Sequence, residues 1–327
     1  MGNLPYERLK VGRPFLNTEV DFCGPFTIKA STIRNAKLQK AYVAIFICLS
    51  KCVHMELVND LTTQSFLAAL KRFFARRGKA KLMMSDNGTN FVGAARELNQ
   101  SICRARQDPQ VANYLASENI TWKFIPSQAP EFGGLWEAAV KSFKFHFRRV
   151  VGDKIFTYEE LMTFLVLIES VLNSRPILAL SPSPNDLAPL TPGHFLIGDS
   201  LTSIGEEDLQ EAKQSTLPRW RRVQQMFQSF WKRWTQEYLS NLQVRTKMLK
   251  GNCNLQIGQL VLLKDERTPP LKWPLARICE THPGADDLIR VVTLKSRNGV
   301  IKRPINKICP LPSRIGSEES PEEEEEI

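Results

Sequence analysis

The stretch AYVAIFICLSKCVHMELV occupies residues 41–58. Its first half, residues 41–49, is apolar and rich in β-branched side chains, which is typical of a strand buried on both faces. Ser50-Lys51 can form a turn, after which apolar and polar residues alternate as in a second strand. An apolar segment that begins at Thr18 and is stopped by Gly24-Pro25 precedes both. The sequence therefore predicts three consecutive antiparallel strands.

After residue 58 the hydrophobic period changes from that of strands to that of helices. Thr62 and Thr63 can cap a helix whose apolar stripe ends before Gly78. Further strands are predicted at 81–86 and 121–126, and further helices at 92–106, 111–117, 135–151 and 159–173, the last capped by Thr157. The order β-β-β-α-β-α-β-α-α predicts an α/β fold with a mixed sheet flanked by helices.

The second half of the chain has a different composition. Five prolines between 176 and 192 indicate a linker or an ordered surface loop. A long helix is predicted at 217–250, and short strands separated by turns predict a small β-barrel at 255–312. We therefore expect five regions: a lead-in at 1–15, a core at 16–200, a basic helical connector at 201–254, the β-barrel at 255–312 and an acidic tail at 313–327.

The charge of the chain is unevenly distributed. Its 327 residues include 44 Lys and Arg against 34 Asp and Glu, a net charge of +10. Seven Glu lie among the last ten residues, so residues 1–317 carry 27 acidic residues and a net charge of +17. A body with this charge should bind polyanions, with nucleic acid as the leading candidate. The Glu-rich end is typical of a disordered acidic segment.

Composition argues against several other classes of protein. No apolar run reaches the roughly 18–20 residues of a membrane span, so no membrane partner is expected. The N-terminus has no apolar signal core. The seven cysteines are scattered without a C-x-x-C pair, which indicates reduced thiols in a cytosolic or nuclear protein and no zinc site.

Three acidic residues stand out by their context. Asp21 interrupts an apolar strand, where an unpaired carboxylate is costly. Asp86 ends a strand and opens the turn Asn87-Gly88, and Glu137 follows Gly133-Gly134 in the first turn of a helix. Such carboxylates can hold two Mg²⁺ ions, which prefer oxygen ligands and act on phosphodiesters. Structural explanations stand beside this one, because Asp is common before Asn-Gly turns and Glu in a first turn compensates the helix dipole.

Three motifs that contain these residues resemble the catalytic blocks of retroviral and retrotransposon integrases. They are VDFCGPF at 20–26, SDNGTNF at 85–91 and FGGLWE at 132–137. The closest likeness is to the BEL/Pao group of long-terminal-repeat retrotransposons, which WKFIP at 122–126 and NSRP at 173–176 also resemble. The likeness covers about residues 15–200. Residues 205–312 are similar to the domain that follows the integrase core in these elements.

The resemblance implies an RNase H-like core followed by the helical connector and a small SH3-like β-barrel. It also implies a catalytic triad of Asp21, Asp86 and Glu137 that holds two Mg²⁺ ions, with Mn²⁺ as an alternative. The gap between Asp86 and Glu137 is longer than in retroviral integrases, which we attribute to the helical stretch at 104–117. No His-His-Cys-Cys zinc module precedes the core, so it is encoded upstream or has been lost. Glu131 competes for the third position, although it precedes the glycines, whereas the family's Glu follows them.

Other residues are candidates for contact with DNA. One face of the helix predicted at 135–151 carries Glu137, Lys141, Lys144 and Arg148. This row would place phosphates beside the metal ions, and the alternative is a solvated basic face. The amides of Asn90 and Gln128 suit bases or sugar oxygens near the site. The Trp- and Arg-rich segment at 219–234 either stacks on DNA or packs within the core.

Taken together, these features predict an integrase that trims the 3′ ends of element DNA and joins them to target DNA. We expect it to act as a homo-oligomer in the nucleus, with a cytoplasmic particle or polyprotein stage as an alternative. A domesticated or truncated relative that binds DNA without catalysis is a second hypothesis, favoured by the missing zinc module and the Met1 start. A nuclease of the RNase H kind acting on RNA–DNA hybrids is a third. The Asp/Asp/Glu set favours the enzyme.

Overall fold

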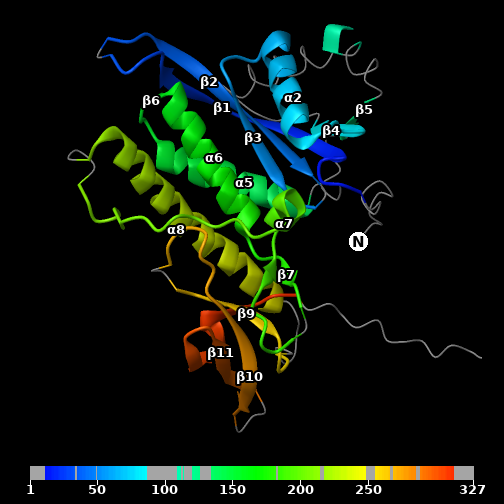
Figure 1. The fold of residues 1–327 in the computed structure, drawn as a ribbon, viewed down its shortest axis with the longest axis vertical. Coiled ribbons are helices and arrows are strands. Elements are labelled where there is room, and N and C mark those ends of the chain that lie inside the picture. Colours follow the sequence, from blue (N-terminus) through cyan, green and yellow to red (C-terminus); the bar gives the residue numbers. More distant parts are fainter. Residues whose placement is uncertain are drawn as a thin grey trace, which may run out of the picture. The chain divides into compact units, whose positions relative to one another are not determined.

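The computed structural model of the chain (Figure 1) describes residues 12–33, 35–48, 50–86, 109–111, 113, 120–125, 134–181, 183–213, 217–247, 255–265, 268–284 and 288–312. At residues 63, 86, 122–125, 134–140 and 244–247 the description covers the backbone alone. The chain divides into two compact units. Unit 1 comprises Met1–Arg175, Pro192–Glu237 and Pro269–Leu271, and unit 2 comprises Pro176–Thr191, Tyr238–Thr268 and Lys272–Ile327.

Unit 1 is built on a mixed sheet with the strand order β3-β2-β1-β4-β5, and β6 pairs with the end of β1. The strands are β1 (Asn17–Lys29), β2 (Leu38–Cys48), β3 (Val53–Val58), β4 (Leu82–Asp86), β5 (Thr121–Ile125) and β6 (Phe156–Thr157). The first three pair antiparallel as predicted, while β4 and β6 run parallel to β1, and β5 runs parallel to β4. The predicted α/β class with a mixed sheet is therefore confirmed.

Strand β1 continues through Gly24-Pro25, so the prediction that this pair stops the strand is wrong. Its pairing with β2 shifts register between Cys23 and Phe26 and then runs on to Lys29. Gly24 permits the shift because its φ is 138° and a Cβ there would lie 2.9 Å from the ring of Tyr42. Such a bulge resets the alternation of faces along a strand. Cys23 and Phe26 therefore face the same side of the sheet although they are three residues apart.

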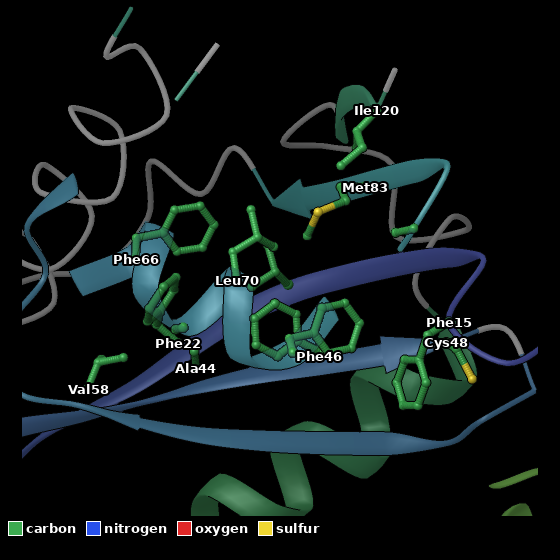
Figure 2. Packing of buried hydrophobic residues seen from close by; sticks show 14 of the residues in the cluster. Phe15, Phe22, Ala44, Phe46, Cys48, Val58, Phe66, Leu70, Met83 and Ile120 are labelled. Carbon is green, nitrogen blue, oxygen red and sulfur yellow. The ribbon is translucent and has the colours of Figure 1, made fainter. Parts of the chain in front are cut away.

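Helix α2 (Thr63–Arg77) covers one face of this sheet. Figure 2 shows Phe22, Phe46 and Leu70 packed between the helix and the strands. The rings of Phe46 and Phe73 stack with their centroids 4.2 Å apart. The helix begins and ends as predicted: Thr62 accepts a hydrogen bond from the backbone of Ser65 at 3.3 Å, and the Gly78 amide donates to Phe74 at 2.9 Å.

Helices α5 (Gly134–Val151) and α6 (Tyr158–Ser174) pack on the other face. The ring of Phe147 in α5 lies 4.9 Å from Phe26 of β1 and 5.6 Å from Phe164 of α6, so one aromatic chain joins strand and helices. The predicted cap of α6 is confirmed, since Thr157 forms a capping box with Glu160. Because side chains alternate along β1, Val20 and Phe22 face α2, whereas Asp21 and Cys23 face α5.

Strand β3 lies at one edge of the sheet, and side chains of α6 satisfy its outward backbone groups. Asn173 accepts from the Val53 amide at 2.9 Å and donates to the Val53 carbonyl at 2.8 Å. Glu169 accepts from the Met55 amide at 2.9 Å. These two side chains do what a further strand would otherwise do, because exposed edge groups need partners.

His54 lies in a buried charged cluster behind that edge. Its Nδ1 is 3.3 Å from Glu169 and its Nε2 is 3.1 Å from Glu56. Arginines of α2 hold the same two carboxylates: Arg72 and Arg76 bind Glu56, and Arg77 binds Glu169. Burial alone would lower the pKa of His54, but its hydrogen bonds with the two glutamates outweigh burial and hold the pKa above its usual value. The sequence pattern indicates only an ordinary surface or packing residue at His54, whereas the structure places it between two buried glutamates.

The proline-rich region after α6 is ordered where it is described. Leu178–Ala179 (β7) and Pro189–Leu190 (β8) form a two-stranded ladder in unit 2, and α7 (Pro192–Ile197) follows in unit 1. The long predicted helix is α8 (Arg219–Lys247). Its residues Trp231 and Trp234 are buried, as a packing role predicts, whereas Trp220 is 51% exposed. No helix in the described part of the chain is both long and apolar enough to span a membrane.

Unit 2 contains an antiparallel sheet in the order β12-β11-β10-β9-β13. Its strands are β9 (Leu260–Leu263), β10 (Leu275–Pro283), β11 (Ile289–Ser296), β12 (Gly299–Pro304) and β13 (Ile308–Pro310). Within the described residues β12 and β13 do not pair, so the sheet is not closed and the predicted SH3-like barrel is not confirmed. Most residues of β12 are exposed, as expected of a strand at an open edge.

Arg277 of β10 fastens the β7–β8 ladder to this sheet. The residue is 3% exposed, and its guanidinium donates to the carbonyls of Ser181, Asp186 and Gly258, each at 2.6 Å. A planar guanidinium with several donors suits this role, because one side chain satisfies three carbonyls from separate segments.

We predict that the cluster around His54 makes stability depend on pH. The folded pKa of His54 is raised, so its contribution is fully present below the unfolded value near 6.5 and is lost as the pH rises through the folded value. His54→Gln should lower the free energy of unfolding by about 1–3 kcal/mol at pH 5.5 and by less at pH 9. Urea unfolding across this range measures the difference. His282→Gln, at a side chain that is 30% exposed, is the control, and a pH-independent loss in His54→Gln would contradict the assignment.

Candidate functional site

Two of the acidic residues singled out from the sequence occupy neighbouring parallel strands. Strands β1 and β4 pair in register up to Val20 and Ser85. The next residues along the two strands are Asp21 and Asp86, and Asp86 is the last residue of β4. Continuing the register sets their backbones side by side, at the roughly 4.8 Å spacing of adjacent strands.

The carboxylate of Asp21 is held on both of its oxygens. Oδ1 accepts from the Phe22 amide at 2.6 Å, and Oδ2 forms an ion pair with the Lys144 ammonium. The Asp21 side chain is 40% exposed. Water and the ammonium therefore offset the cost of a charge between two buried apolar neighbours, Val20 and Phe22.

The basic row of α5 lies against β1 at this point. Lys144 reaches Asp21, and Arg148, one turn later, reaches the thiol of Cys23. Burial raises the pKa of Cys23, while the positive charges of Lys144 and Arg148 act in the opposite direction. Lys141, one turn before Lys144, is exposed. Two of the three predicted basic residues thus face the strand that carries Asp21.

Glu137 lies in the first turn of the same helix. It precedes Lys144 by seven residues, which is two turns or roughly 10 Å of helix. The helix that contacts Asp21 through Lys144 therefore also carries Glu137. The side chains of Asp86 and Glu137 lie outside the described residues, and so do the predicted site residues Asn90 and Gln128 and the alternative Glu131.

Strand β1 carries a second carboxyl group, at Glu19, which was not among the residues predicted from the sequence. Glu19 is 8% exposed and precedes Asp21 by two residues, so both lie on one face of the strand. The signal was present in the sequence, because acids at 19 and 21 flank Val20, which is 1% exposed in the core.

The residues at this point fit a divalent metal ion in ligand chemistry. Mg²⁺ prefers carboxylate oxygens, and here a partly exposed Asp21 stands beside Asp86. Among the side chains that the structure describes, no group of three or more His, Cys, Asp or Glu is arranged to hold a metal. The side chains of Asp86 and Glu137 lie outside this described set. A cation bound at Asp21 would compete with the Lys144 ammonium.

The site thus combines two opposite demands. Acidic residues on β1 and β4 can bind cations, while the basic row of α5 can bind anions. A phosphodiester group bound together with metal ions would use both kinds of residue: the acidic residues would bind the metal ions, and the basic residues would bind the phosphate oxygens.

Comparison of the sequence with known families finds one match. A family of unknown function, DUF5641, matches residues 218–311, which extend from α8 to the end of the unit 2 sheet. The match covers less than a third of the chain and leaves the candidate site outside it. No curated protein matches the chain at a significant level.

Among the solved structures to which the chain is similar are an intasome and two integrase catalytic core domains. One is the structure of the simian T-cell lymphotropic virus intasome in complex with the PP2A regulatory subunit B56 gamma. The match covers 93% of this chain and 82% of the matched chain, at 11% sequence identity and a TM-score of 0.37. The match to the catalytic core domain of BIV integrase covers 56% of this chain and 95% of the matched chain, at 14% sequence identity and a TM-score of 0.36. The match to the HTLV-2 integrase catalytic core domain in complex with magnesium covers 34% of this chain and 61% of the matched chain, at 15% sequence identity and a TM-score of 0.22.

We predict that Lys144 weakens metal binding at Asp21. Lys144→Gln removes the competing ammonium, so the affinity for Mg²⁺ or Mn²⁺ should rise about two- to five-fold, the range for a partly exposed ion pair. Isothermal titration calorimetry with the metal ion alone measures this change. Lys141→Gln removes the same charge from an exposed position of α5 and serves as the control. Equal effects of the two substitutions would show that only net charge matters.

Proposed function

We propose that this chain is an integrase-like polynucleotidyl transferase that cuts and joins DNA. The observation that carries the proposal is the β1–β4 register, whose continuation past Val20 and Ser85 brings the backbones of Asp21 and Asp86 together. Strand β1 also contacts the helix that bears Glu137, through the ion pair of Asp21 with Lys144. The integrase-like motifs at these three positions support the proposal. We further propose that residues 16–200 form an RNase H-like core of the BEL/Pao type. The mixed strand order β3-β2-β1-β4-β5 is compatible with such a core.

The acidic residues and the basic row of α5 would have different roles, the first in binding metal ions and the second in binding phosphates. Asp21, Asp86 and Glu137 would hold two Mg²⁺ ions, or Mn²⁺, which when bound would activate the attacking oxygen and stabilise the leaving one. Lys144 and Arg148 would hold the phosphates of the bound strand. Lys144 would then exchange its ion pair with Asp21 for a phosphate oxygen. The protein's own contribution would be position and charge neutralisation.

The reaction would consist of two exchanges at phosphorus. In the first, a water oxygen replaces the 3′-oxygen of a phosphodiester near the end of element DNA and frees a 3′-hydroxyl. In the second, that hydroxyl attacks a phosphodiester of target DNA and displaces its 3′-oxygen. Each exchange forms one P–O bond and breaks one, so no covalent link to the protein is needed.

The partners follow from the same proposal. The net charge of +17 on residues 1–317 suits element ends and target DNA, both of which are polyanions. Joining two element ends to one target requires more than one active centre, which supports a homo-oligomer. Target DNA places the site of action in the nucleus.

One observation favours a second candidate, a DNA-binding descendant without catalysis. The Lys144 ammonium already compensates Asp21 within the chain, as a protein that no longer uses metal would require. Such a protein would bind DNA through the basic row and would leave phosphodiesters intact.

We predict that Asp86→Asn lowers 3′-end cleavage and strand transfer at least about 100-fold, because it removes the charge of a metal-holding residue next to Asp21. Asp21→Asn and Glu137→Gln should act alike. The measurement is a Mg²⁺-dependent assay on labelled oligonucleotide ends, run beside DNA binding, which these variants should retain.

Glu131→Gln is the matched control, since it changes the competing acid and should leave activity within about two-fold. If wild type binds DNA but neither cuts nor joins it, the second candidate holds. Cleavage of an RNA–DNA hybrid without any joined product would identify a nuclease of the RNase H kind.

A further inference from the structure

Unit 1 has a pocket remote from Asp21 and Asp86. The pocket, of about 510 Å³, lies at the end of β1, between the segment before α6 and the first turns of α8. Lys29, the last residue of β1, is part of its wall. Lys29 lies eight positions after Asp21, which corresponds to roughly 25 Å of extended strand. The pocket is therefore distinct from the candidate catalytic site.

The wall of the pocket is positively charged. Its charged side chains are Lys29, Lys154, Arg219, Arg222 and Glu160. Arg219 and Glu160 neutralise each other through two hydrogen bonds of 2.6 and 2.8 Å. Among the described residues, Lys29, Lys154 and Arg222 form no ion pair with an acidic side chain. Three cations with no acidic partner among the described side chains thus border one cavity, which favours an anionic ligand.

Two of these cations are held in place by backbone groups. Lys154 donates to the Val150 carbonyl at 2.9 Å, and Nε of Arg222 donates to the Leu217 carbonyl at 2.9 Å. A carbonyl orients a cation without cancelling its charge. Burial lowers the pKa of Lys154, as expected for an ammonium partly removed from water. Both side chains would therefore lose less conformational freedom when they bind a ligand.

The rest of the pocket is apolar. Ile155 and Phe156 contribute from the segment before α6, and Val223 and Met226 contribute from α8. Ile155 is 41% exposed, whereas Phe156, Val223 and Met226 are buried, so Ile155 supplies most of the apolar surface that is open to solvent beside the three cations. A free phosphate would use the cations and leave this surface wet. A ligand that joins a phosphate to a flat ring uses both parts, and the volume is within the range of small-ligand pockets.

We propose that this pocket binds one unpaired nucleotide of a single DNA strand, with its base on the apolar surface and its two flanking phosphates on Lys154 and Arg222. A duplex offers phosphates but keeps its bases stacked inside, whereas a single strand presents base faces and phosphates together. Trp220, which follows Arg219 in α8 and is 51% exposed, offers a stacking surface for a neighbouring base. The inference takes only its ligand, nucleic acid, from the proposed function and requires neither metal nor catalysis.

The experiment measures binding of a labelled single-stranded oligonucleotide to the full chain by fluorescence anisotropy, at several salt concentrations and without divalent metal. The double variant Lys154→Ala/Arg222→Ala should weaken binding about ten-fold. It should also lower the slope of log affinity against log salt by about 1.4, since each phosphate contact with a single strand contributes about 0.7.

The matched control removes two exposed charges of α8 outside the pocket, Lys232→Ala/Arg233→Ala. It should change affinity and slope by less than half as much. An equal effect would overturn the proposal, because binding would then follow net charge alone. Thermal unfolding midpoints identify any variant that fails to fold.

Two further arms identify the ligand chemistry. Ile155→Ser should weaken single-strand binding about three-fold and leave the salt slope unchanged, because the charges remain. A deoxynucleoside monophosphate should compete better than inorganic phosphate, and equal competition would reduce the site to a simple anion pocket. If the Lys154/Arg222 variant weakens duplex binding as much as single-strand binding, the unpaired nucleotide is excluded.

These results are independent of the proposed function. A chain whose pocket binds single strands as described, but which has no metal-dependent cleavage, would uphold the pocket and overturn the transferase. If the chain cuts and joins DNA but its Lys154/Arg222 variant binds single strands as well as wild type does, the transferase proposal stands and the pocket proposal is overturned.

Discussion

The candidate site depends on the position of one strand, β1. It pairs antiparallel with β2 on one side and parallel with β4 on the other, so it must be apolar on the face that α2 covers. The alternation of side chains then leaves the other face for Asp21 and Cys23, next to α5. The bulge at Gly24 lets the strand continue and return Phe26 to that same layer, where it meets Phe147. The position of Asp21 therefore follows from the packing of its neighbours.

Charge in unit 1 is compensated within the fold in some places and left open in others. The glutamates at 56 and 169 are surrounded by His54 and arginines, which fits a structural role. Asp21 has only the partly exposed Lys144 as its ionic partner among the described residues. The pocket at Lys154 has the opposite imbalance, with cations and too few acids. Solvent-accessible charges of these two kinds are available for ligands, whereas the buried cluster is not.

Much of unit 1 could be predicted from the sequence, because periodicity and helix caps are local signals. The residues at 41–58, the caps at Thr62 and Thr157 and the spacing of Lys141, Lys144 and Arg148 all reflect nearest neighbours along the chain. The continuation of β1 past Gly24-Pro25 could not be read this way, because a bulge depends on the partner strand. Nor could the cluster at His54, whose members come from β3, α2 and α6. The pairing of Asp21 with Lys144 joins residues 123 apart in sequence.

Asn173 restricts how copies of this chain can associate. Its amide supplies the donor and acceptor that Val53 would otherwise offer to a neighbouring strand, and Glu169 occupies the next amide. The Val53 backbone and the Met55 amide are therefore not available to a strand of a second chain at this edge. At this end of β3, association would use side-chain surfaces, which discriminate between partners, in place of backbone pairing, which accepts almost any sequence.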